Sequence, residues 1–140
     1  MAYVLLRKSD GSTQPDKNTS STTATNPTDG EPKIQSAAKG AYVAYSDGLF
    51  ASTKGTRLLF FHAPWCPQCR ALDESIKSSE LPDGVTIFKV DYDSNQPLRT
   101  KYGVTLQTTV VKVDDKGNKL ASYIAYNKPA FQSVKQALLP

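Results

Sequence analysis

The chain has 140 residues and a mass of 15.3 kDa, which is enough for one ordinary domain. Its formal net charge of +4 is spread along the sequence rather than gathered in a basic run, which argues against nucleic acid or a membrane surface as a partner. No apolar run reaches the ~18 residues that a helix needs to cross a bilayer. We therefore expect one globular domain that acts as a monomer.

Residues 1–40 are predicted to form a disordered linker. Between residues 9 and 36 there is no aromatic side chain, and Ile34 is the only large apolar one. Such a segment buries too little apolar surface to offset the entropy lost on ordering. If residues 2–8 end an apolar segment further upstream, the linker would tether the domain outside the cytoplasm, although Arg7 and Lys8 favour a cytoplasmic location. The folded domain is then expected to span residues 41–140.

Strands and helices are predicted to alternate from residue 57 onward. The continuous apolar run 57–63 suits a strand that is buried on both faces. After it, apolar residues recur at helical spacing over 69–76, and Asp73 precedes Lys77 by four residues, as in a helical charge pair. Residues 86–93 alternate between apolar and polar side chains, which predicts a second strand.

The second half of the chain continues this alternation. Residues 96–103 predict a short helix with a proline in its first turn and a glycine after its end. The runs 108–113 and 119–126 flank a turn-rich segment and predict an antiparallel hairpin. Asn127 is expected to cap a last helix, whose apolar face holds Phe131, Val134 and Leu138. This order predicts an α/β fold with helices on the faces of a sheet.

The only two cysteines, Cys66 and Cys69, lie where a predicted strand gives way to a helix. A two-residue separation at such a turn is typical of a redox-active dithiol. Unpaired backbone N–H groups at the helix N-terminus favour a thiolate at Cys66, which we expect to be the exposed thiol with a pKa below the free value of ~8.5. Cys69 is expected to be the buried thiol that resolves a mixed disulfide. Pro67 suits the first helical position, and Gln68 adds no charge beside the thiolate.

Three other interpretations of the cysteine pair are weaker. A structural disulfide would close too short a loop to remove much chain entropy. A zinc ion needs about four ligands, and two cysteines with the single histidine, His62, do not supply them within one chain. Inert core cysteines would leave the tryptophan beside the pair and the helix start unexplained. No metal and no cofactor other than the Cys66–Cys69 disulfide itself is therefore predicted.

The stretch FFHAPWCPQC, residues 60–69, resembles the strand, turn and active-site helix of the thioredoxin family. The resemblance extends from about Tyr42 to Leu139. It implies a central mixed sheet with helices on both faces, with Cys66 as the nucleophile, Cys69 as the resolving thiol and Trp65 packed over the site. It also implies thiol–disulfide oxidoreductase activity, in which electrons pass between the cysteine pair and protein thiols or disulfides.

The sequence departs from the family at the buried acid that thioredoxins carry six positions before the first cysteine. That position is Phe60 here. Lys89 matches the lysine that usually accompanies the acid, and either assists proton transfer or extends its charge to solvent. His62, four residues before Cys66, is expected to serve packing more readily than to act as a base.

A second departure lies in the loop after Tyr-Gly-Val, residues 102–104, where Thr108 stands in place of the family's cis-proline. A cis bond before a residue other than proline costs about 3–4 kcal/mol, so the Gln107–Thr108 bond is predicted to be trans. Thr108 would bring an N–H and a hydroxyl within reach of the Cys66 sulfur. Loss of the proline is also expected to leave the thiols less shielded.

We interpret the chain as a thiol–disulfide oxidoreductase that acts outside the cytoplasm on protein substrates, with a redox partner still to be identified. The direction of electron flow is open. Less shielded thiols support an alternative, a binding module in which two chains supply four cysteines to an iron–sulfur cluster or zinc. A third reading is an interaction domain of the same fold without redox chemistry.

Overall fold

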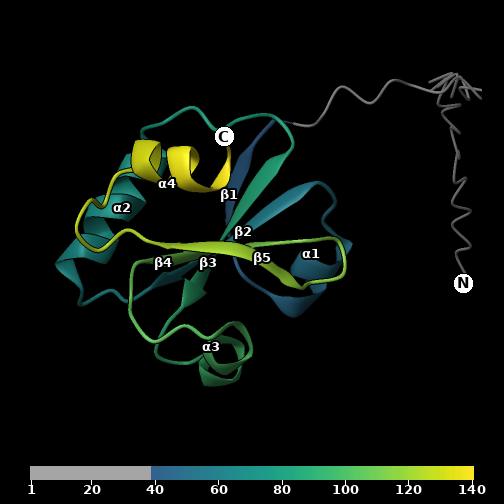
Figure 1. The fold of residues 1–140 in the computed structure, drawn as a ribbon, viewed down its shortest axis with the longest axis horizontal. Helices are drawn as coiled ribbons and strands as arrows, with labels where there is room; N and C mark the ends of the chain where they lie inside the picture. Colours follow the sequence, from purple (N-terminus) through teal and green to yellow (C-terminus); the bar gives the residue numbers. More distant parts are fainter. Residues whose placement is uncertain (1–38) are drawn as a thin grey trace, which may run out of the picture. The chain divides into compact units, whose positions relative to one another are not determined.

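The computed structural model describes residues 39–140, so the predicted linker lies almost wholly outside the described residues and remains a prediction. The described part contains a five-stranded sheet with helices packed against it (Figure 1). None of the helices in residues 39–140 is long and apolar enough to cross a membrane.

The sheet is mixed, as predicted. Its strands follow the order β1-β3-β2-β4-β5. The first three in this order are parallel, and β4 and β5 continue as an antiparallel hairpin. Their bounds are β1 Ala41–Ala44, β2 Thr56–His62, β3 Val85–Asp91, β4 Thr109–Val113 and β5 Lys119–Ile124. The central position of β2 explains its continuous apolar sequence, because all residues from Arg57 to His62 are buried.

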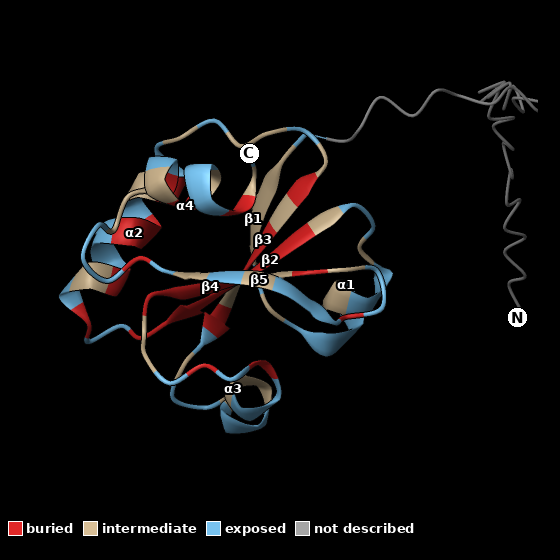
Figure 2. Ribbon diagram, viewed as in Figure 1, coloured by how far each residue is buried: buried red, intermediate tan, exposed pale blue. Residues whose placement is uncertain are grey.

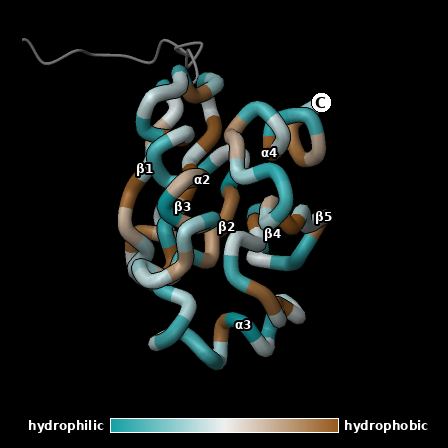
Figure 3. The backbone as a smooth tube through the Cα atoms, turned by 90° about the vertical axis from the view of Figure 1, so that its left-hand side faces the viewer, coloured by the Kyte–Doolittle hydropathy of each residue, from teal (hydrophilic) through white to brown (hydrophobic). Residues whose placement is uncertain are grey.

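Helices cover both faces of the sheet (Figure 1). On one face, α2 (Pro67–Lys77) and α4 (Phe131–Leu138) pack against a core that includes Leu58 and Phe60. On the other, α1 (Asp47–Ser52) and α3 (Gln96–Tyr102) cover a core that includes Leu59 and Phe61. The strands β2 and β3 lie between these two layers of helices. They are largely buried in Figure 2 and largely hydrophobic in Figure 3.

The predicted helix ends are mostly confirmed. Proline occupies the first turn of α2 and of α3, and Gly103 ends α3 in the left-handed conformation with φ 68°. The predicted cap of the last helix is wrong, because α4 has Ala130 at its N-cap and no side-chain cap bond. Instead the Ser75 hydroxyl of α2 accepts a hydrogen bond from the Phe131 N–H at 2.8 Å. The predicted face of this helix is confirmed, since Phe131, Val134 and Leu138 are all buried.

Candidate active site

Cys66 is the N-cap residue of α2, directly after the turn that follows β2. Its backbone is extended, with φ −92° and ψ 118°, and Pro67 then begins the helix with its own φ fixed near the helical value. The Cys66 sulfur accepts a hydrogen bond from the Cys69 N–H at 3.4 Å. The sulfur therefore takes the place that a serine or aspartate oxygen usually occupies at a helix start, which confirms the predicted position at the N-terminus.

Both cysteines are free thiols, and both are buried, with exposed fractions of 2% for Cys66 and 0% for Cys69. The prediction that Cys66 would be exposed is therefore wrong. The Thr108 hydroxyl oxygen lies beside both thiols, 3.4 Å from the Cys69 sulfur and 3.8 Å from the Cys66 sulfur. Thr108 is itself fully buried beside the thiols, and the expectation that loss of the proline leaves them less shielded than in the family stays a prediction.

The two thiols nevertheless differ in acidity in the predicted direction. Burial raises the pKa of the Cys66 thiol, but hydrogen bonds from Cys69, from the Thr108 hydroxyl and from the Gln68 backbone outweigh it, and the net pKa is lowered. At Cys69 burial dominates, and the neighbouring Cys66 adds to it, so the pKa of Cys69 is raised. Cys66 is thus the thiol that more readily becomes a thiolate.

Thr108 adopts a backbone conformation that a β-branched residue rarely takes, with φ 64°. The described residues contain no cis peptide bond, so the predicted trans bond between Gln107 and Thr108 is confirmed. The Thr108 N–H donates to the Phe61 carbonyl at 3.0 Å, and its own carbonyl accepts from the Ala125 N–H at 2.8 Å. Only the hydroxyl, and not the predicted N–H, therefore faces the sulfurs.

The remaining predicted neighbours lie around the pair at different distances. The Gln68 side-chain oxygen accepts from the Cys66 thiol at 3.5 Å. Gln107 is half-buried and precedes Thr108 in the loop. Trp65 is 57% exposed, and its indole N–H donates to an Asp93 carboxylate oxygen at 2.8 Å. The indole is therefore held at the surface by the loop that follows β3.

A buried carboxylate that the sequence analysis did not assign to the site lies on α2. Asp73 is one turn after Cys69, and it accepts a hydrogen bond from the Tyr42 hydroxyl at 2.6 Å. It also pairs with Lys89 at 3.0 Å and with Lys77 at 2.6 Å, which confirms the predicted helical charge pair. The signal was present in the sequence, because Asp73 is a charged residue on the apolar face of a predicted helix.

The Asp73 cluster shows how Lys89 is paired although Phe60 stands at the position of the family's buried acid. Phe60 is fully buried and pairs in register with Lys89 on the neighbouring strand. Lys89 pairs with a carboxylate on α2, and its side chain remains partly exposed, so the two roles predicted for it, proton transfer and extension to solvent, stay predictions. Burial raises the pKa of Asp73, but its bonds to Lys77, Tyr42 and Lys89 lower it to about 2, so Asp73 is ionised at neutral pH.

His62 is buried, with an exposed fraction of 8%, and its ring meets the Phe60 ring edge-on with centroids 5.5 Å apart. Burial and the nearby charge of Lys89 lower the pKa of His62, so the imidazole is neutral at neutral pH. These contacts describe a packing residue. Within residues 39–140, His62 and the cysteines form no group of three or more side chains that could hold a metal ion.

The model of the thioredoxin family matches residues 37–134. A thioredoxin from Bacillus subtilis is 33% identical over 79 residues, which cover 54% of this chain and 76% of that protein. The protein disulfide isomerase-like 2-2 of rice, Oryza sativa, is 39% identical over 66 residues, covering 44% of this chain but only 18% of that protein.

Solved structures share the fold. Trxlp from Edwardsiella tarda has a TM-score of 0.58 at 22% identity, covering 71% of this chain and 99% of that chain. A mutant thioredoxin from Halobacterium salinarum has a TM-score of 0.55 at 25% identity, covering 73% of this chain and 95% of that chain.

Proposed function

Because the chain belongs to the thioredoxin family of thiol–disulfide oxidoreductases, we propose that Cys66 and Cys69 exchange electrons with disulfides of protein substrates. The observation that carries this proposal is the opposite shift of the two pKa values at one helix start. A nucleophile with a lowered pKa and a neighbouring thiol that keeps its proton are what stepwise disulfide exchange requires.

The exchange proceeds in two displacements. The Cys66 thiolate attacks one sulfur of a substrate disulfide, forms a mixed disulfide and releases the other substrate sulfur as a thiolate, which takes up a proton. Cys69 then loses its proton and attacks the Cys66 sulfur, which forms the Cys66–Cys69 disulfide and releases the second substrate thiolate. The substrate gains two electrons and the protein loses two, and the reverse sequence oxidises a substrate dithiol.

Thr108 supports both steps through one hydroxyl. A threonine hydroxyl can donate one hydrogen bond and accept others, so it can donate to the Cys66 thiolate before the first displacement. After Cys66 is in the mixed disulfide, the same hydroxyl is free to turn to Cys69, whose sulfur is the nearer of the two at 3.4 Å. A donor there stabilises the Cys69 thiolate while it attacks.

The proposal is tested by reduction of insulin disulfides and by trapping of the intermediate. We expect Cys66→Ser to abolish reduction and to form no mixed disulfide. Cys69→Ser should also stop turnover, but it should accumulate a mixed disulfide that migrates as a larger species without reductant. The assignment of roles would be refuted if the wild-type chain did not turn over insulin in the presence of a reductant that regenerates its dithiol. It would also be refuted if Cys66→Ser formed a mixed disulfide.

The direction of electron flow follows from the reduction potential of the Cys66–Cys69 pair. The neutral Gln68 adds no positive charge beside the Cys66 thiolate and so favours a reductant more than a strong oxidant. Equilibration with glutathione measures this potential. A value near about −270 mV indicates a reductant, and one near about −120 mV indicates an oxidant.

A further inference from the structure

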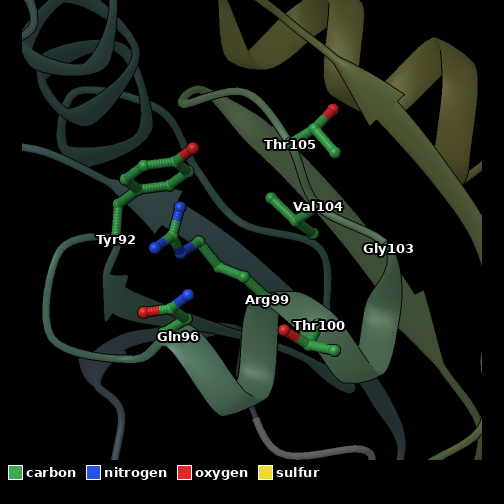
Figure 4. Close-up of a pocket in the computed structure, with 7 residues that line it drawn as sticks. All are labelled: Tyr92, Gln96, Arg99, Thr100, Gly103, Val104 and Thr105. Atoms are coloured by element: carbon green, nitrogen blue, oxygen red, sulfur yellow. The ribbon is translucent and has the colours of Figure 1, made fainter.

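A pocket lies between the end of β3, helix α3 and the loop after it (Figure 4). Its volume is about 360 Å³. Its lining is mainly polar or aromatic and includes Tyr92, Gln96, Arg99, Thr100 and Thr105. The proposed exchange chemistry uses none of these side chains.

Arg99 is the only charged residue in the lining of this pocket. Its guanidinium carbon lies 4.0 Å from the centroid of the Tyr92 ring, so the charge is held against an aromatic face. The Nε atom is buried and has no acceptor among residues 39–140. No carboxylate in this part of the chain forms an ion pair with Arg99. The pocket therefore presents a cation that is stacked on an aromatic ring and has no carboxylate partner among the residues that the structure describes.

The nearest acidic residues along the chain have other partners. Asp91 accepts hydrogen bonds from the backbone N–H and the hydroxyl of Ser94. Asp93 accepts the indole N–H of Trp65. Each carboxylate thus accepts from a neutral donor, and neither forms an ion pair with Arg99.

The pocket adjoins the thiols through the backbone on two sides. The Tyr92 N–H donates to the carbonyl of His62, four residues before Cys66, at 2.9 Å. On the other side Thr105 belongs to the loop that continues to Thr108, whose hydroxyl faces both sulfurs. A polypeptide with its disulfide at Cys66 can therefore extend over the pocket.

We propose that this pocket binds the carboxylate of an acidic side chain in the substrate polypeptide and so selects substrates that carry such a residue near their disulfide. The inference rests on the proposed exchange function. The planar guanidinium presents paired donors that match a carboxylate. The amide of Gln96, which lies beside the guanidinium in Figure 4, offers a further donor.

A tethered carboxylate fits this pocket better than a free anion does. A guanidinium–carboxylate pair open to water contributes little by itself, so a free carboxylate would bind weakly. A carboxylate on a chain that is already docked at Cys66 reaches the pocket at a high effective concentration. The same weak pair then becomes sufficient to distinguish one substrate from another.

The test compares the reduction rates of matched disulfide peptides by the full chain. Each pair differs only by glutamate or glutamine, placed in turn at successive positions on either side of the cysteine. At one or two positions we expect the glutamate peptide to have about fivefold higher kcat/KM, which is the range of a partly exposed ion pair. This preference should shrink in 1 M salt because exposed charges are screened.

Two substitutions of Arg99 and one control locate the effect. Arg99→Gln should abolish the preference for glutamate, so that the kcat/KM values for the glutamate and glutamine peptides become equal. Arg99→Met, which keeps the aliphatic stem over the Tyr92 ring, should do the same. Lys101→Gln removes one positive charge from the same helix but outside the pocket lining, and it should retain the preference.

The proposed role of the pocket would be overturned by equal rates for the two peptides at every position. It would also be overturned by a preference for glutamate that survives both Arg99 substitutions. If Lys101→Gln removes the preference as fully as Arg99→Gln does, the preference comes from the general positive charge of the helix. That result would also overturn the proposal. Failure of the wild-type chain to reduce either peptide is a different result, because it refutes the exchange function on which the pocket rests.

Discussion

The two faces of the sheet contain different kinds of core. The face covered by α1 and α3 is filled with aromatic side chains, where Phe50 and Phe88 meet edge-on with centroids 5.3 Å apart and Tyr45 contacts both. The face covered by α2 and α4 holds both thiols and the ionised Asp73 with its partners. Both faces thus contain a buried apolar core, but only the face covered by α2 and α4 also contains the thiols and a buried charge.

The difference follows from where α2 begins. This helix starts at the end of β2 and packs on one face only, so every residue on its inner side, from Cys69 to Ile76, faces the same core. A buried carboxylate on that inner side must be satisfied by groups from the same face. Tyr42 from β1 and Lys89 from β3 supply them. The opposite face has no helix that carries a thiol.

The largest effect on stability is expected from Phe88→Ala, on the aromatic face. Removing a fully buried phenyl ring leaves a cavity and should lower the free energy of unfolding by about 3–5 kcal/mol. Urea unfolding measures this loss. If the two faces are separate, the rate of alkylation of Cys66 in the folded protein should stay within about twofold of the wild-type rate. A larger change in that rate would show that the faces are coupled.

A smaller loss is expected from Asp73→Asn, on the face of the thiols. The substitution removes the charge that Lys89 and Lys77 share and should cost about 2–3 kcal/mol, less than for a fully buried pair because Lys89 is partly exposed. The matched control is Glu74→Gln, on the same helix turn but exposed, with only a 3.9 Å contact to Lys77. Equal losses for both variants in urea unfolding would contradict a special role for the buried cluster.

The lowered pKa of Asp73 also predicts that the stability difference between wild type and Asp73→Asn depends on pH. The pKa of Asp73 is lowered to about 2 in the folded chain, against about 3.9 for an unfolded aspartate, so the folded state favours the ionised form. The stability from this ionisation is fully present above the unfolded pKa and is lost as pH falls toward about 2. The difference in unfolding free energy between wild type and Asp73→Asn should therefore shrink between pH 5 and 2. A constant difference over this range would contradict the assigned pKa.

The smallest effect is expected at Thr108, where one hydroxyl serves both thiols. Thr108→Ala should raise the pKa of Cys66, because it removes one hydrogen bond to the thiolate, and slow its alkylation near neutral pH by roughly two- to fivefold. Thr108→Ser keeps the hydroxyl and should stay near the wild-type rate. If alanine and serine variants react alike, the hydroxyl contributes nothing to the thiolate.

The sequence predicted most of the elements because their signals are local. The apolar run of β2, the helical spacing of α2 and the turn between β4 and β5 can each be read within about ten residues. The start of α4 was predicted less well, since its first N–H is satisfied by Ser75 of another helix and not by Asn127. A cap supplied from a distant element leaves no local pattern.

The sequence by itself determined the position of Cys66 at a helix start, because a strand, a turn and Pro67 in direct succession allow little else. Only the tertiary structure decided the surroundings of that sulfur. The Thr108 hydroxyl comes from 42 residues further along the chain, and Asp73 is bound by Tyr42, 31 residues before it. Burial of Cys66 and the ionised state of Asp73 both depend on such distant contacts, which the packing of the sheet brings together and which no local spacing specifies.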